Sequence, residues 1–331
     1  MSTHLLQKIV SSVAILLAIA CQSGNTNDQP VQRERDIDRI PEDQIVRWVA
    51  TTGMIGDALE NVGGKYAKVY TMMGPGVDPH LYKPSPADLS YLENAHFFCH
   101  NGLQLEGKFS EILETSWGYR RTYAMVAGLS VNDLIDIDNY EANQDPHFWF
   151  DLNLWSKAID SLALVISQDL DGIFDILQAN SLRYRSELEK ADEWAKQVIG
   201  DIPEDKRVLV TSHDAFRYFG RAYGMEVRAL QGTSTVSEFG VRDVTNLVNY
   251  LVENRIPAIF PESSISPKSL KAVIEGCRKK GHEVTLGPTL YGDALGETGT
   301  PEGTLIGAFR RNVINIYEAL TGNEYQETDY E

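Results

Sequence analysis

The feature that most constrains this 331-residue chain is an alternation of short apolar runs with helix-like segments. Apolar runs of strand length lie at residues 45–51, 67–73, 95–99 and 123–127, and again at 208–211, 227–230, 258–260 and 283–286. Short strands separated by helical segments are typical of βαβ units, in which parallel strands pair and helices cover the sheet. The pattern predicts an α/β protein with parallel sheets flanked by helices.

One segment interrupts this alternation. Residues 176–199 contain no glycine, no proline and no strand signal. Small or apolar side chains recur there at steps of four and three: Leu177, Ser181, Tyr184, Leu188, Ala191, Ala195 and Val198. This period predicts one continuous helix, about 36 Å long at 1.5 Å per residue, ended by Gly200 and Pro203. Because strand-rich chain lies on both sides, we expect a rigid backbone helix that joins two lobes. A long surface helix within one domain is the alternative.

The N-terminus predicts export. Lys8 is followed by an apolar run at residues 9–20 and then by Cys21. A charged start, a short apolar stretch and small residues before a cut site describe a secretory signal, and the run is short for a membrane span. A cysteine directly after it resembles a bacterial lipobox, which implies cleavage before Cys21 and acylation of its sulfur. Ala18 stands where leucine is commonest, so a plain signal peptide with an incidental cysteine is the alternative.

The chain therefore divides into six predicted parts. Residues 22–44 are polar and charged and cannot bury enough surface to fold, so they predict a tether. The predicted parts are a lipoprotein signal peptide (1–20), a disordered tether (21–44), an N-terminal lobe (45–175), a linking helix (176–200), a C-terminal lobe (201–322) and an acidic, frayed tail (323–331).

Charge and cysteine content exclude some functions. The formal net charge is −17 and no Lys/Arg cluster occurs, so the surface repels nucleic acid. Such a surface can concentrate divalent cations, although solubility alone would also explain it. After acylation of Cys21, the cysteines Cys99 and Cys277 remain, which permits one disulfide. Their flanks look like separate buried elements, and we expect two packed thiols.

Two histidines occupy matching turns. The tripeptide Asp-Pro-His occurs at residues 78–80 and again at 145–147. Proline fixes φ and favours extended geometry before it, so His80 and His147 are presented from stiff turns. The aspartate of each turn is expected to orient the imidazole.

Two further candidates follow apolar strands. His213 comes at the end of the run 208–211, and Asp293 lies in a loop after another apolar segment. Ligands of open α/β sheets gather beyond the carboxyl ends of parallel strands. The wide separation of these residues lacks the tight spacing of a zinc finger, so spacing leaves open whether they are ligands or solvated loop residues.

Several motifs in order resemble a known family. They are residues 71–82, Asn101-Gly102-Leu103, residues 145–149, residues 210–224 and residues 290–303. These segments resemble the zinc/manganese family of ABC-transporter solute-binding lipoproteins with the TroA-like fold, over residues 45–322.

The resemblance has specific implications. It implies two lobes joined by one rigid helix, with a metal site in the cleft between them. One ion is expected to be held by His80 and His147 of the first lobe and by His213 and Asp293 of the second. It also implies an extracytoplasmic, membrane-anchored protein, in the periplasm or at the cell surface, that delivers metal to a permease driven by a partner ATPase. We expect a monomer, no catalysis and no binding of nucleic acid.

The identity of the metal stays open at this point. Three imidazoles and a carboxylate suit Zn(II), and they suit Mn(II) if the carboxylate is bidentate. In the family a His-rich acidic loop often accompanies zinc specificity, and here residues 131–145 are acidic without histidine. Members with glutamate as third ligand favour manganese, whereas this chain has His213. The loop without histidine argues against zinc and His213 argues against manganese, so the two trends disagree.

Other polar residues near the predicted cleft have less certain roles. His100 follows a strand and precedes the Asn101-Gly102 turn, and Glu262 lies in a glutamate-serine turn similar to one in the family. Contact of either with the site is an open alternative. His96 and His282 are expected to have structural or solvated roles.

Two other functions compete with metal delivery. A zinc-dependent hydrolase needs an open metal position for water, and the motifs His-Glu-x-x-His and Gly-x-Ser-x-Gly are absent from the sequence. A surface adhesin with a structural metal is the second alternative, for which the sequence contains no recognisable binding patch.

Overall fold

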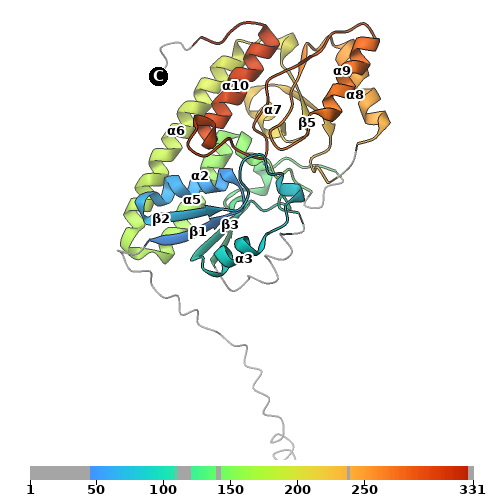
Figure 1. The fold of residues 1–331 in the computed structure, drawn as a ribbon. Coiled ribbons are helices and arrows are strands. Elements are labelled where there is room, and N and C mark those ends of the chain that lie inside the picture. The colour runs from blue at the N-terminus through green and yellow to red at the C-terminus, as the bar shows by residue number, and fades with distance from the viewer. Residues whose placement is uncertain (1–44, 108, 110–120, 139–142, 237–238, 327–331) are drawn as a thin grey trace, which may run out of the picture. The chain divides into compact units, whose positions relative to one another are not determined.

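Strands and helices alternate along the chain as the sequence predicts (Figure 1). The computed structural model describes residues 45–107, 109, 121–138, 143–236 and 239–326. The predicted signal peptide, Cys21, the tether and residues 327–331 lie outside this range. Among the described residues, no helix is both long enough and apolar enough to cross a membrane.

The first sheet has four parallel strands in the order β2-β1-β3-β4. They are β1 (Val46–Ala50), β2 (Ala67–Thr71), β3 (Phe97–His100) and β4 (Arg121–Ala124). Its helices are α2 (Gly53–Gly63) and α3 (Pro86–Glu93). Helix α2 packs closely on β2, because a Cβ at Gly56 would come within 2.2 Å of the Thr71 hydroxyl. Glycine at this position lets the helix approach the sheet.

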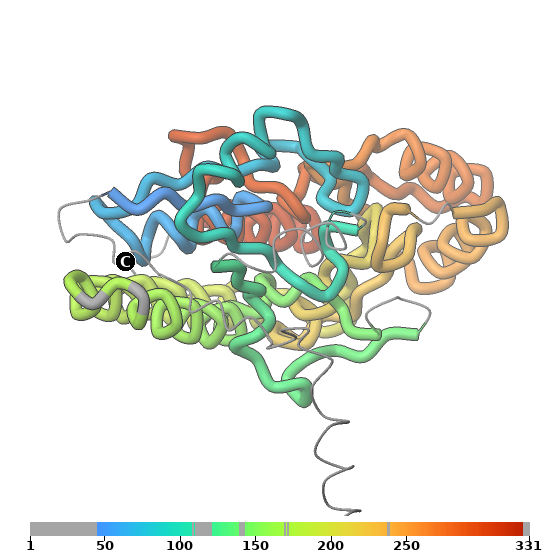
Figure 2. The backbone as a smooth tube through the Cα atoms, turned by 90° about the horizontal axis from the view of Figure 1, so that it is seen from below, coloured from blue at the N-terminus to red at the C-terminus, as the bar shows by residue number. Residues whose placement is uncertain are grey.

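The second half repeats the same strand order. It contains β5 (Val208–His213), β6 (Glu226–Gln231), β7 (Ala258–Ile259) and β8 (Thr285–Leu286), paired in parallel as β5-β6 and β7-β8. A parallel bridge between Thr211 and Phe260 places β7 beside β5, which gives the order β6-β5-β7-β8. Helices α7 (Arg217–Tyr223), α8 (Val241–Glu253) and α9 (Lys268–Lys279) belong to this half. The first strands (blue) and helices α8 and α9 (orange) lie at opposite ends of the described fold, as two lobes (Figure 2).

A long helix runs between the lobes. Helix α6 (Phe174–Gly200) is continuous over 27 residues and ends at Gly200. All seven positions of the predicted stripe are buried, together with Asp192 and Ile199. The helix contacts α2 and α5 (Leu152–Asp169) of the first lobe and α7 and α10 (Leu305–Thr321) of the second. The prediction of one continuous backbone helix is confirmed.

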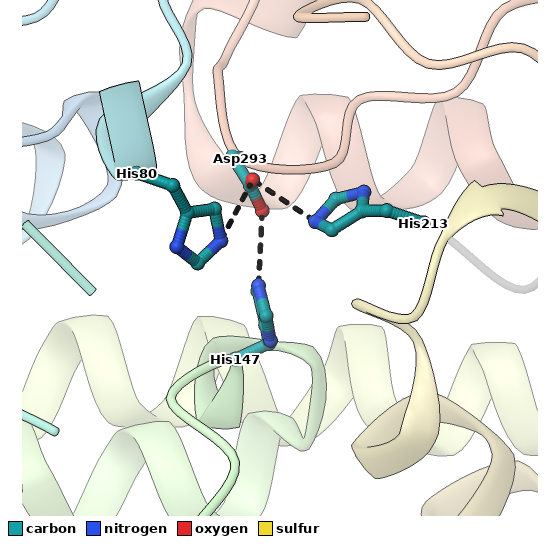
Figure 3. Close-up of side chains that lie close together, drawn as sticks. All are labelled: His80, His147, His213 and Asp293. Atoms are coloured by element: carbon teal, nitrogen blue, oxygen red, sulfur yellow. Dashed lines mark ion pairs between the residues drawn. The ribbon is translucent and has the colours of Figure 1, made fainter. Parts of the chain in front are cut away.

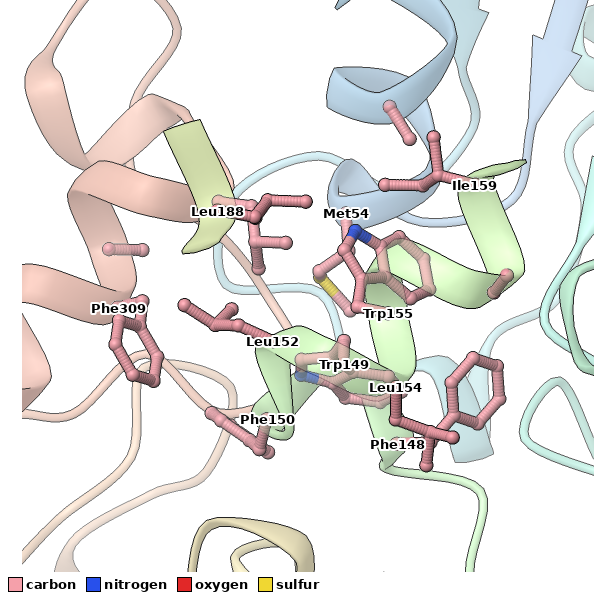
Figure 4. Close-up of a cluster of buried hydrophobic side chains, with 14 of the residues drawn as sticks. Met54, Phe148, Trp149, Phe150, Leu152, Leu154, Trp155, Ile159, Leu188 and Phe309 are labelled. Atoms are coloured by element: carbon pink, nitrogen blue, oxygen red, sulfur yellow. The ribbon is translucent and has the colours of Figure 1, made fainter. Parts of the chain in front are cut away.

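The two lobes share one hydrophobic core around this helix (Figure 4). Met54 of α2, Trp155 of α5, Leu188 of α6 and Phe309 of α10 belong to the same buried cluster. A second cluster lies under α8 and α9, and a third lies beside α3. Since the main cluster spans both halves, the described residues between 45 and 326 form one compact unit rather than two independent domains.

Short 3-10 turns connect these elements. Their bounds are Gly64–Tyr66, Pro79–Leu81, Met125–Gly128, Val131–Asp133, Phe148–Phe150, Asp171–Ile173, Glu204–Lys206 and Pro301–Gly303. The predicted strand at 123–127 is wrong beyond Ala124, where the chain turns into the 3-10 segment that begins at Met125. An apolar run shows that a segment is buried, but it does not show where strand pairing ends.

Cys99 and Cys277 are buried free thiols, as expected.

The first residues of the predicted tail contact the rest of the fold. Residues 323–326 are not frayed, because the Tyr325 hydroxyl accepts a hydrogen bond from Trp194 Nε1 at 2.8 Å and the Tyr325 ring packs edge-on against that indole. An aromatic residue in the tail thus has a partner on α6.

Candidate metal centre

Four side chains from distant parts of the chain converge at one point (Figure 3). One nitrogen from each of His80, His147 and His213 and one oxygen of Asp293 all lie within 4.8 Å of one another. The Nε2 atoms of His80, His147 and His213 lie 3.6, 3.4 and 3.1 Å from the nearer Asp293 oxygen. The four residues that the sequence singled out are therefore brought together.

The first-lobe histidines are held by their Asp-Pro-His turns. Asp78 caps the 3-10 turn Pro79–Leu81 by accepting a hydrogen bond from the His80 backbone N–H. Asp145 accepts one from the His147 backbone N–H at 2.9 Å and another from ring atom Nδ1 at 2.7 Å. The predicted contact of Asp145 with the imidazole is present, and it directs Nε2 of His147 toward the centre. The Asp78 carboxylate instead bonds the backbone of His80 and the hydroxyl of Thr235.

His213 of the second lobe is held by a glutamate. His213 is the last residue of β5, and its backbone N–H donates to Glu262 Oε1 at 2.9 Å. Glu262 Oε2 lies 2.8 Å from Nδ1 of the same ring, so the candidate role of Glu262 as a neighbour of the site is supported. Asp293 follows Gly292, whose missing side chain makes room for Glu262, because a Cβ there would lie 2.5 Å from Oε2.

The site is closed to solvent and short of hydrogen-bond partners. His80 is 5% exposed, His147 and His213 are 0% and Asp293 is 2% exposed. Within the described part of the chain, the three Nε2 atoms and both Asp293 oxygens have no hydrogen-bond partner. Buried polar atoms without partners are costly. A cation bound among them would satisfy all five atoms, so the residues present fit a single metal ion.

The local electrostatics prepare these groups to bind a cation. Burial lowers the pKa of His80 to about 3, so its ring is neutral at physiological pH. Burial alone would raise the pKa of Asp293, but the three imidazoles outweigh it and hold that pKa well below its usual range. Burial alone would lower the pKa of His213, but Glu262 and Asp293 outweigh it and raise that pKa well above 6.5. Below that raised pKa, a metal ion that binds His213 would displace a proton from it.

The remaining histidines lie elsewhere. His100 is buried and stacks on Phe98, and it is not part of the converging group. His96 Nδ1 accepts from the Arg47 backbone N–H, and His282 Nε2 lies 2.8 Å from the Ile256 carbonyl. His96 thus has a structural role, whereas His282, expected in a solvated turn, is half-buried and contacts the backbone.

The sequence did not reveal three residues that brace the site. The Asn101 side chain donates to the Pro146 carbonyl, just before His147. Tyr218 accepts a hydrogen bond from the Ile135 backbone N–H and donates one to the Asp145 carbonyl. Thr235 donates to Asp78. These partners are 45, 73 or more residues apart, and no local pattern indicates them.

Comparison with known proteins assigns the class. The family model described as ZnuA, zinc-uptake complex component A, periplasmic, matches residues 49–319. The chain belongs to this family, which consists of solute-binding proteins of metal transport.

Individual relatives agree with this assignment. The chain is 46% identical to the manganese-binding lipoprotein MntA of Bacillus subtilis, over 84% of this chain and 90% of that protein. It is 39% identical to the zinc-binding protein TroA of Treponema pallidum, over 82% of this chain and 88% of that protein. The solved structure of periplasmic TroA from Treponema pallidum matches with a TM-score of 0.80 and 38% identity, covering 83% of this chain and 99% of that chain. The two-lobed TroA-like fold predicted from the sequence is confirmed.

Proposed function

We propose that this protein captures one Mn(II) or Zn(II) ion outside the cytoplasm and delivers it to the permease of an ABC importer. His80, His147, His213 and Asp293 would be the ligands. The observation that carries this proposal is the convergence of four buried donor groups whose facing atoms have no hydrogen-bond partner in the described chain. Four protein donors leave no open position for a catalytic water, which argues against a zinc hydrolase.

The carboxylate geometry bears on which metal is carried. Asp293 Oδ1 faces His147, whereas Oδ2 faces His80 and His213, so both oxygens point into the site. A bidentate carboxylate raises the coordination number and accommodates Mn(II) as well as Zn(II). The relatives named for manganese and for zinc both support a site of this dual kind. By the Irving–Williams order, the affinity for Zn(II) should exceed that for Mn(II).

Anchoring completes the proposal. We infer that residues 1–20 are removed, that Cys21 carries the lipid and that residues 22–44 tether the protein to the membrane. The lobes at 45–175 and 201–322, the linking helix at 176–200 and the tail at 323–331 make up the rest. Relatives named as lipoproteins support this anchoring. The protein would act as a monomer that meets the permease and, through it, the ATPase.

The test compares the metal affinity of a variant that lacks one proposed ligand with that of a variant that lacks a histidine outside the site. His147→Ala should still fold, with unchanged far-UV circular dichroism, but it should lose more than the roughly 10–100-fold in metal affinity that follows loss of an outer contact. His282→Ala is the matched control, because His282 lies outside the site. Titration with Zn(II) and with Mn(II) measures both. A His147→Ala protein that binds one ion at wild-type affinity would refute the ligand set.

Transport and catalysis assays separate the rival functions. A strain lacking this gene should grow poorly at low manganese or zinc and recover when metal is added. A deletion strain that grows like the wild type at low manganese and zinc would favour an adhesin with a structural metal. Peptide or ester hydrolysis that disappears in Asp293→Ala would favour a hydrolase.

A further inference from the structure

Strand β6 lies at one edge of the second sheet, and its outer side is unpaired. Among the strands of the described chain, only β5 pairs with it. The Glu226 N–H donates to the Arg207 carbonyl, on the β5 side. Because successive residues of a strand turn their backbone groups to opposite sides, Val227 and Ala229 turn theirs away from β5. Both residues are partly exposed, so their N–H and C=O groups are open to another strand.

A cavity lies beside this open edge on each face of β6. Val227 points toward α7, where a Cβ at Gly220 would come within 2.6 Å of it. Arg228 points toward α8, and its guanidinium lies 4.9 Å from the centre of the Tyr250 ring. The cavity on the α7 face has a volume of about 530 Å³ and the cavity on the α8 face about 320 Å³. Arg228 and Ala229 line both, so the open edge runs between the two cavities.

The cavity on the α7 face is basic, although the whole chain has a formal net charge of −17. Arg217, Arg221 and Arg228 line it, together with the carboxylate of Asp214. The side chains of the three arginines are 41%, 41% and 53% exposed. Arg217 donates to Asp214 through Nε, and its two terminal nitrogens have no partner among the described residues. Planar guanidinium groups of this kind bind carboxylates, so this cavity suits acidic side chains.

The cavity on the α8 face has a different character. Leu230, Leu247 and Tyr250 form much of its wall. Leu230 and Leu247 belong to the buried cluster under α8 and α9, so the wall is part of a packed core. This cavity suits an apolar side chain.

We propose that an extended segment of a partner protein, with acidic side chains at every second position and apolar side chains between them, adds to β6 as a further strand. Its backbone bonds the open groups of Val227 and Ala229. Because the side chains of a strand alternate between its faces, the acidic ones enter the basic cavity and the apolar ones enter the cavity beside α8. Charge complementarity favours this partner over a second copy of this chain, which would bring its own Arg228 to the same edge.

A synthetic peptide tests the proposal. Fluorescence anisotropy should show that a labelled peptide of alternating glutamate and valine binds the non-lipidated chain from Gln22 to Glu331. A peptide of the same composition, with its three glutamates before its three valines, should bind about tenfold more weakly or less, because it cannot fill both cavities at once. A peptide of alternating lysine and valine should not bind. Equal binding of all three peptides, or no binding of the first, would overturn the proposal.

A proline on the open edge tests the contribution of the backbone. Ala229→Pro removes an N–H that points away from β5, so the sheet keeps its bonds while the peptide loses one. Its affinity for the alternating peptide should fall by about tenfold. Leu286→Pro is the matched control, because the N–H groups of Thr285 and Gly287 bond toward β7 and that of Leu286 points outward from the opposite edge. Both variants should keep the wild-type far-UV circular dichroism. Equal peptide affinity of the two variants would contradict strand addition.

Two further measurements do not depend on the proline variant. Arg217→Gln should weaken binding by about three- to tenfold, whereas Arg242→Gln, on an exposed position of α8 outside both cavities, should change it by less than about twofold. In the wild type, the peptide should slow amide hydrogen exchange at Val227 and Ala229, measured by nuclear magnetic resonance. Unchanged exchange at both amides would show that the peptide binds without adding a strand.

The chain's own tail is the remaining competitor for this edge. Glu327, Asp329 and Glu331 alternate with other residues in the sequence, as the acidic positions of the peptide do. A chain that lacks residues 327–331 should bind the peptide with wild-type affinity. Binding that becomes about tenfold tighter would identify the tail as the occupant and refute a separate partner.

Discussion

Glu262 offers the most informative single substitution, because it touches His213 twice without facing the ion. Its two oxygens lie 2.9 Å from the His213 backbone nitrogen and 2.8 Å from Nδ1, and both side chains are fully buried. In Glu262→Gln the amide group retains one acceptor, so one of the two contacts is lost. A buried contact of this charged kind contributes about 1.5–3 kcal/mol. We expect metal affinity at alkaline pH to fall by about 10–100-fold, as for other outer contacts of metal ligands.

The pH dependence of this loss gives a sharper test. In the wild type, Glu262 and Asp293 raise the pKa of His213 well above 6.5, so below that pKa the metal must displace a proton. Wild-type affinity should fall about tenfold for each pH unit below the raised pKa of His213. In Glu262→Gln that pKa is lower, so the affinity should stay constant down to a more acidic pH. The ratio of wild-type to variant affinity should therefore shrink as the pH falls.

Competition titration against a chromogenic chelator, between about pH 6 and pH 9, measures both curves. Glu275→Gln is the control, because Glu275 pairs with Arg278 on an exposed face of α9. An affinity ratio that stays the same at every pH would show that Glu262 does not act through the proton of His213. A variant that binds metal like the wild type at alkaline pH would show that Glu262 does not support the ligand.

Two further substitutions test the packing around the site and the helices. Gly292→Ala places a Cβ 2.5 Å from the present position of Glu262 Oε2, so it should weaken metal binding by about tenfold in the same titration; unchanged affinity would contradict this account. Burial raises the pKa of Asp57 from 3.8 to about 6, although the hydrogen bond from Tyr184 lowers it. The protonated Asp57 carboxyl therefore stabilises the fold below pH 3.8, and this contribution is lost as the pH rises through 6. Asp57→Asn cannot ionise and should gain up to about 3 kcal/mol over the wild type between pH 4 and pH 7, measured by urea unfolding; a difference independent of pH would refute the reasoning.

Features with a regular local period could be predicted from the sequence. The stripe of seven residues from Leu177 to Val198 predicted helix α6 almost to its ends, because helical burial repeats every 3.6 residues. The ends of strands had no such signal. The run at 123–127 looked continuous, yet pairing stops at Ala124. Pairing depends on the neighbouring strand, which a local window does not contain.

In the candidate site, too, some residues could be predicted from the sequence and others could not. Position after a strand and the repeated Asp-Pro-His turn singled out the four converging side chains, while the family resemblance was needed to assign them to one ion. The contacts of Tyr218 with Asp145 and of Thr235 with Asp78 could not be predicted. They join residues 73 and 157 positions apart, and the residue types are ordinary for a helix and a loop. Such pairs become visible only when the two lobes are placed side by side.

The shared core around α6 has a consequence for how the protein can change. Met54 of the first lobe, Leu188 of the linking helix α6 and Phe309 of the second lobe pack in one apolar cluster. Neither half can separate from the other without exposing that cluster to water, at roughly 25 cal/mol for each Å². Large opening motions, as in proteins whose two domains are joined by flexible strands, would therefore carry a high free-energy cost in this molecule. The two halves must therefore stay together as one folding unit.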